Sequence, residues 1–252
     1  MRVVFILAAS VILLLPARAE GPYPRWLAIG DSITQHAMSE ELQWFGESRG
    51  MAASSVSLDY VHLLLARLQA RDPRNATDLK IVGRVARLSA GTVEKMDDVA
   101  DELRAWGPDL VTIQLGENDH LDQIGADKFE QCYRRLIEAV LSAPKRPIVV
   151  CTGVWLPGVP LDPADGTKYA AAPPAVAEGR EKDLIIEKIC REKGLIFVPV
   201  ATFASVPQNH GAGVDKGVQW HPNDAGMRGY ADALFNALYP EPQVSAASPA
   251  AP

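Results

Sequence analysis

The sequence predicts an α/β protein in which a parallel sheet of five strands is covered by helices on both faces. Three observations support this fold class: short apolar runs alternate with longer amphipathic segments, Gly or Pro follows several of these segments, and the composition is that of a globular protein. Of the 252 residues, 48% are hydrophobic and 22% are charged, as in a chain that buries a large core. Strands that alternate with helices pair in parallel, because each helix carries the chain back along the sheet.

The elements follow one another in a regular order. Five short apolar runs bounded by turn residues predict strands at residues 26–30, 80–85, 109–115, 147–152 and 195–200. Five segments with apolar residues at spacings of three and four predict helices at residues 59–69, 93–106, 126–142, 178–193 and 224–238. Residues 35–56 and 154–177 fall outside this alternation. Loops of such length in a compact domain usually serve function, so we expect lids or substrate walls there.

The two ends of the chain differ from the rest. Met1-Arg2 precedes an apolar run over residues 3–15, and the small-x-small sequence Ala17-Arg18-Ala19 follows it. This pattern predicts a cleaved signal peptide over residues 1–19, with an uncleaved membrane anchor as the alternative. Residues 20–240 are expected to form a single domain, secreted or periplasmic. Residues 241–252 are rich in Pro, Ala and Ser and predict a disordered tail.

Charge and cysteine content exclude several classes of function. The net charge is -6 and no run of Lys and Arg occurs, which disfavours nucleic acid or, after signal cleavage, a membrane surface as a partner. The three cysteines, Cys132, Cys151 and Cys190, lack the paired spacing of a zinc site and are expected to be buried apolar residues. We therefore expect no metal and no cofactor, and a neutral or sugar-like substrate. The sequence does not indicate an oligomeric state.

Polar residues follow the predicted strands where the carboxyl ends of a parallel sheet collect functional groups. In LAIGDSITQHAM, residues 27–38, Ser32 follows the first strand and Gly30 allows close backbone approach. Ser32 is suited either to be a nucleophile or to cap a helix. In QLGENDH, residues 114–120, Asn118 follows the third strand, where its amide can donate to a group above the sheet.

Two further stretches complete the set. His221 lies in QWHPNDAGM, residues 219–227, before the last predicted helix, with Asn223 or Asp224 as its cap. Histidine titrates near neutral pH, so an imidazole there can take a serine proton and return it to a leaving group. The small residues of RLSAGTV, residues 87–93, leave backbone N–H groups open to a developing oxyanion.

Together these stretches resemble the blocks of the SGNH, or GDSL-type, hydrolases. The blocks are GDSIT at residues 30–34, a small Gly turn at 89–92, GEND at 116–119 and HPND at 221–224. The resemblance covers most of residues 20–240 and implies a three-layer α/β/α sandwich with a five-stranded parallel sheet of the flavodoxin-like type. It also implies ester hydrolysis with Ser32 as nucleophile and His221 as base. The oxyanion hole would combine the backbone N–H of Ser32, the Asn118 amide and the backbone N–H of Gly91 or Ala90.

One position departs from the family pattern. The usual acid lies three residues before the histidine, where this chain has Val218. The nearest upstream acid is Asp215, which a rearranged loop could bring to the imidazole. Alternatively, a backbone carbonyl orients the ring and the pair works as a Ser-His dyad, since the third member fixes tautomer and orientation.

The loops around these blocks suggest a substrate. Trp44 and Trp155 suit the apolar faces of sugar rings, although a Trp more often fills a loop interior. Asp31, His36 and His120 lie beside the blocks and are expected to line the pocket. We therefore expect a serine esterase that releases small acyl groups, above all acetyl, from a small-molecule or polysaccharide ester. The alternatives are a lysophospholipase or thioesterase, and a non-catalytic carbohydrate-binding protein.

Overall fold

The computed structural model describes residues 23–73, 76–83, 93–155, 158–160, 169–171, 173–211 and 215–240. Its main sheet has five strands in the order β2-β1-β3-β4-β7, and every neighbouring pair is parallel. The strands are β1 (Arg25–Gly30), β2 (Asp78–Val82), β3 (Leu110–Gln114), β4 (Ile148–Thr152) and β7 (Ile196–Val198). This confirms the five predicted strands and the flavodoxin-like order. The predicted signal peptide and tail lie outside the described residues.

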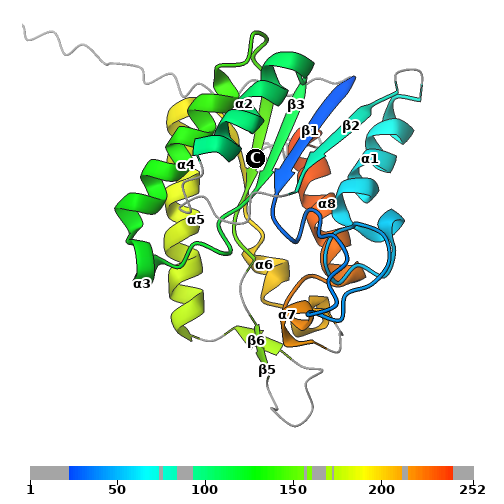
Figure 1. Cartoon of the computed structure of the whole chain (residues 1–252), viewed down its shortest axis with the longest axis vertical. Helices are drawn as coiled ribbons and strands as arrows, with labels where there is room; N and C mark the ends of the chain where they lie inside the picture. The colour runs from blue at the N-terminus through cyan, green and yellow to red at the C-terminus, as the bar shows by residue number, and fades with distance from the viewer. Residues whose placement is uncertain are drawn as a thin grey trace, which may run out of the picture.

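Helices cover both faces of the sheet, which gives three layers (Figure 1). One face carries α1 (Tyr60–Arg71) and α8 (Asp224–Leu238), and the other carries α2 (Val93–Trp106), α4 (Ala126–Leu141) and α5 (Pro173–Lys193). Along β1, Trp26 and Ala28 belong to the first hydrophobic cluster, whereas Leu27 and Ile29 belong to the second. Because both faces are buried, the strand is apolar throughout rather than alternating. The predicted three-layer sandwich is therefore confirmed.

Several elements were not predicted. Helix α5, predicted to begin at residue 178, begins at Pro173, and β5 (Gly158–Pro160) pairs antiparallel with β6 (Tyr169–Ala171) inside the loop after β4. The short helices α3 (Leu121–Ile124), α6 (Ala201–Ala204) and α7 (Lys216–Gln219), and the 3-10 turns η1 (Val56–Leu58) and η2 (Pro207–Asn209), also went unpredicted. Elements of three or four residues are too short for an apolar residue pattern to repeat, so the sequence does not predict them.

The carboxyl end of the sheet is the crowded end. In Figure 1 the loop after β1, helices α6 and α7, and the β5–β6 hairpin gather beyond this edge. Cys151 and Cys190 are buried and Cys132 is partly buried, and all three are free thiols, as expected for apolar fillers. None of the described helices combines the length and the apolar character that crossing a bilayer requires.

Candidate active site

Ser32 lies in a tight turn directly after β1. The backbone N–H groups of Thr34 and Gln35 donate to the carbonyl oxygen of Asp31 at 3.1 and 2.9 Å. Gly30 permits this turn, because a Cβ there would overlap the Thr34 hydroxyl. Within the described residues no helix starts at Ser32, so the helix-cap interpretation is wrong.

The turn is fixed to the core through one side chain. The hydroxyl of Thr34 is buried and lies 2.7 Å from the Tyr60 hydroxyl and 2.9 Å from Oε1 of Gln114. These bonds connect the end of β1 to helix α1 and to strand β3. Ser32 itself is only partly buried, so its hydroxyl is held by a rigid turn while remaining partly accessible.

His221 contacts the Ser32 hydroxyl. The distance from Ser32 Oγ to His221 Nε2 is 2.7 Å, across 189 positions of the chain. On the other side of the ring, Nδ1 lies 2.6 Å from the carbonyl oxygen of Gly217. A carbonyl only accepts, so Nδ1 carries the hydrogen and a neutral ring presents the lone pair of Nε2 to the hydroxyl. Asn223 caps α8 by accepting from two backbone N–H groups, as predicted.

The environment keeps this imidazole neutral. His221 is 3% exposed, and burial lowers its pKa to about 3. The hydrogen bond to Gly217 acts in the opposite direction, while the charges of His36 and His210 lower the pKa further. The base form is therefore the resting form at neutral pH.

Asp215 has a different role from the one considered for it. Its Oδ1 accepts from the backbone N–H of Gly217 at 2.6 Å, which makes Asp215 the N-cap of α7. The structure thus contradicts the prediction that Asp215 orients the imidazole. The alternative, a backbone carbonyl, matches the contact between Gly217 and His221.

Asn118 lies beside the Ser32 turn. Its Nδ2 is 3.4 Å from Oδ2 of Asp31, so the ends of β1 and β3 bring Ser32 and Asn118 close together. Gly116 makes the turn after β3 possible, because its φ is +127° and an added Cβ would lie 2.9 Å from Val154 Cγ1. The other expected oxyanion donors, Gly91 and Ala90, lie outside the described residues.

Two carboxylic acids lie directly behind these residues. Asp31 is only 2% exposed and its Oδ1 accepts from the Ile33 N–H at 3.0 Å, so the expectation that Asp31 binds substrate is wrong. Glu117 is 9% exposed, and its Oε1 accepts from the Trp155 N–H at 2.9 Å. Glu117 therefore links the loops that follow β3 and β4.

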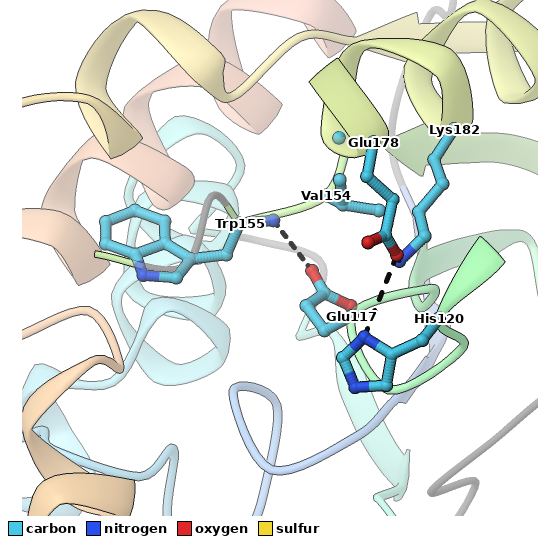
Figure 2. A pocket seen from close by; sticks show the side chains of 7 residues that line it. Glu117, His120, Val154, Trp155, Glu178 and Lys182 are labelled. Carbon is cyan, nitrogen blue, oxygen red and sulfur yellow. Dashed lines mark hydrogen bonds and ion pairs between the residues drawn. The ribbon is translucent and has the colours of Figure 1, made fainter. Parts of the chain in front are cut away.

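A small cavity opens on the α5 side of Glu117 (Figure 2). It has a volume of about 30 Å³, which accommodates a few water molecules at most. Lys182 is buried and pairs with Glu178 at 2.7 Å. His120 Nδ1 lies 3.7 Å from the same carboxylate, so the expected pocket residue His120 does face a cavity, although one too small for a sugar ring.

Neither tryptophan forms an open platform. Trp155 is 1% exposed and donates from Nε1 to the Trp220 carbonyl at 2.6 Å. Figure 2 shows its ring turned away from the side chains around the cavity. Trp44 is 7% exposed, and the Arg49 guanidinium covers its ring at 4.1 Å. The expectation that Trp44 and Trp155 stack on sugar is therefore wrong. Both close loop interiors.

A family model for GDSL-like lipases and acylhydrolases matches residues 28–228. This span contains Ser32, Asn118 and His221. The chain belongs to the GDSL-like lipase/acylhydrolase family. As a member of the GDSL family it is a carboxylic ester hydrolase.

Solved structures support the same fold for this GDSL hydrolase. A catalytic mutant of Axe2, an acetylxylan esterase from Geobacillus stearothermophilus, matches with a TM-score of 0.58 and 19% identity over 88% of this chain and 97% of that chain. A two-domain esterase active on acetylated mannans matches at 0.52 and 18% over 85% and 48%. The psychrotrophic esterase EstA from Pseudoalteromonas sp. matches at 0.53 and 14% over 85% and 96%. No curated protein matches the chain by sequence.

Sequence reasoning considered a backbone carbonyl in the GDSL hydrolase site without assigning it to a residue, and it missed Glu117. The Gly217 carbonyl has no side-chain signature, and only the short helix α7 places it. Glu117 did have a signal, because it is an acid next to Asn118 and lies three residues after the end of the buried strand β3. A charged residue close to the end of a buried strand needs a hydrogen-bond or ion-pair partner, because burying an unpaired charge costs free energy.

Proposed function

We propose that this GDSL hydrolase is an exported serine esterase that removes acetyl or similar small acyl groups from carbohydrate. The observation that carries the proposal is the 2.7 Å contact between Ser32 Oγ and His221 Nε2. The acetylxylan esterase and the esterase active on acetylated mannans among its structural neighbours support a carbohydrate ester as substrate. The signal-like pattern of residues 1–19 supports export, to the periplasm or outside the cell.

The first half of the reaction forms an acyl-enzyme. Ser32 Oγ attacks the ester carbonyl carbon while Nε2 of His221 takes the hydroxyl proton. The oxyanion that develops accepts hydrogen bonds from the backbone N–H of Ser32 and the amide of Asn118, with Gly91 or Ala90 proposed as the third donor. The C–O bond to the sugar then breaks, and the imidazolium returns its proton to the leaving sugar oxygen.

The second half releases the acid. A water molecule attacks the acyl carbon, and Nε2 of His221 takes its proton. The bond to Ser32 Oγ breaks and the serine regains a proton from the imidazolium, so that the enzyme is restored and the carboxylic acid leaves.

The orienting group is a peptide carbonyl in this proposal. The Gly217 oxygen fixes the tautomer and the ring plane of His221 through its 2.6 Å contact with Nδ1. It carries only a partial charge, so it stabilises the imidazolium less than a carboxylate does. Catalytic mutants of Axe2 replace a serine, an aspartate and a histidine. The present chain is proposed to work with a dyad instead.

A second candidate function is the hydrolysis of lipid acyl esters. Met38 and Phe45 are 60% and 57% exposed on the loop after β1, and apolar side chains near an ester site suit an acyl chain or a lipid surface. The neighbours active on acetylated polysaccharides favour the first candidate. The length of the preferred acyl group separates the two.

The test measures product release by the protein as it is exported, with any signal peptide removed. Acetate release from acetylated xylan and mannan is compared with the hydrolysis of p-nitrophenyl esters of increasing acyl length. We expect the highest kcat/KM for acetyl esters, with a loss of about 10³-fold or more in Ser32→Ala and His221→Ala. The exposed serine variant Ser57→Ala is the matched control. Turnover no faster than Ser32→Ala refutes the proposal, whereas a preference for long acyl chains selects the lipid candidate.

A further inference from the structure

Two buried carboxylic acids lie side by side under the proposed nucleophile and oxyanion donor. Asp31 directly precedes Ser32 and Glu117 directly precedes Asn118. The strands that lead to them are neighbours, with Gly30 paired to Gln114 in the parallel register. The Glu117 carboxyl lies close enough to act on the charge of Asp31, and the two residues are only 2% and 9% exposed.

A hydrogen bond between the carboxyls of Asp31 and Glu117 requires a proton. Two ionised carboxylates cannot bond to each other, because both only accept. Oε1 of Glu117 accepts from the Trp155 N–H, but Oε2 is buried and receives no ordinary donor from the described residues. A protonated Asp31 supplies that donor, since its O–H can point to the carboxylate of Glu117.

The proton belongs on Asp31. Burial raises the pKa of Asp31 well above its usual range, and the charge of Glu117 and the hydrogen bond to it raise the pKa further. The hydrogen bond from the Ile33 N–H opposes this shift.

The surroundings of the pair contain several charges and titratable groups. Lys182 is the cation that lines the cavity with Glu117, and it is already paired with Glu178. The other titratable groups around the pair are His120 at the cavity, Asp183 on α5, Tyr60 on α1, Tyr133 on α4 and Tyr230 on α8. No group in this described set offers Asp31 a direct counter-charge, so protonation is the remaining way to neutralise it.

We propose that Asp31 and Glu117 share one proton, and that this proton keeps Asp31 neutral so that the amide of Asn118 stays available to the oxyanion. Asn118 Nδ2 already lies 3.4 Å from Asp31 Oδ2. An ionised Asp31 draws that amide toward itself and places a negative charge beside the developing oxyanion. The effect on Asn118 rests on the proposed function, whereas the shared proton does not. Glu117 is thus a positioning residue that acts through Asp31.

Infrared difference spectroscopy of the full-length protein tests the proton directly. At pH 8 Asp183, whose pKa burial raises to about 6, is ionised. We expect the wild-type protein to retain a protonated-carboxyl C=O band at this pH, and we expect Asp31→Asn and Glu117→Gln to lose it. Glu178→Gln, which lines the same cavity, is the control and keeps the band. A wild-type spectrum without the band overturns the proposal, even if a variant fails to fold.

Kinetics test the consequence. In Glu117→Gln we expect kcat for p-nitrophenyl acetate at pH 8 to fall about 10- to 100-fold, less than or comparable to the loss of an oxyanion donor. KM should change little, and activity should recover at lower pH as Asp31 takes up its proton. An unchanged pH profile for Glu117→Gln overturns the role of the pair. If the wild-type protein shows no hydrolysis, the proposed function fails, while the infrared band still decides the shared proton.

Discussion

Replacing Asp215 by asparagine is the sharpest test of how His221 is oriented. In the structure, Asp215 only caps α7, by accepting from the Gly217 N–H at 2.6 Å. Asparagine caps a helix about as well as aspartate. The Gly217 carbonyl should therefore stay in place, and we expect kcat/KM for p-nitrophenyl acetate to remain within about threefold of wild type.

Asp215→Ala calibrates the same experiment. Loss of an N-cap costs about 1 kcal/mol, which corresponds to about a fivefold change in the population of a correctly placed α7. We expect activity to fall by no more than about that factor. Removal of the acid from a true triad costs about 10⁴-fold in kcat. A loss in Asp215→Asn that approaches the loss in His221→Ala, with the fold intact by circular dichroism, refutes the dyad.

Two further predictions concern pH. Burial lowers the pKa of His221 to about 3. The kcat/KM value should therefore stay high below pH 6.5 and decline only at more acidic pH. A pH profile of kcat/KM that falls on the acid side with a midpoint at 6.5 or above contradicts this prediction. Burial raises the pKa of Asp183 from 3.8 to about 6, so its contribution to stability is present below about pH 4 and is lost as pH rises through 6. The free energy of unfolding in urea should therefore rise in Asp183→Asn relative to wild type by about 2–3 kcal/mol as the pH changes from 4 to 7.5. An equal difference between the two proteins at both pH values rules this out.

Much of the fold could be predicted because its signals are periodic. The alternation of apolar strands with amphipathic helices places α8 at residues 224–238 and α2 at residues 93–106, as observed. The cap of α8 by Asn223 could also be predicted, because it depends only on neighbouring residues in the sequence. The β5–β6 hairpin and α7 depend on tertiary contacts rather than on a repeating pattern, so the sequence offers no equivalent signal.

The site was predictable in its residue types but not in their surroundings. Ser32, Asn118 and His221 carry side-chain chemistry that a motif preserves. The sequence does not distinguish a tryptophan that faces a sugar from one that is buried in the core. Only the packing around Trp44 and Trp155 shows that both are buried. The orientation of His221 depends on a carbonyl that every residue possesses, so it could not be assigned before the backbone was traced.

The use of the Gly217 carbonyl makes the orientation of His221 insensitive to most single amino-acid substitutions at position 217. A triad acid can be deleted by one nucleotide change, but every amino acid at position 217 still carries a peptide oxygen. An added Cβ at Gly217 would lie 2.9 Å from Asp215 Oδ1 and 3.5 Å from Leu42 Cδ2, so small side chains demand only a modest adjustment. Inactivation through this contact requires a change that moves the main chain. Position 217 can therefore differ among relatives as long as α7 forms, and the orienting group will then escape any comparison of side chains.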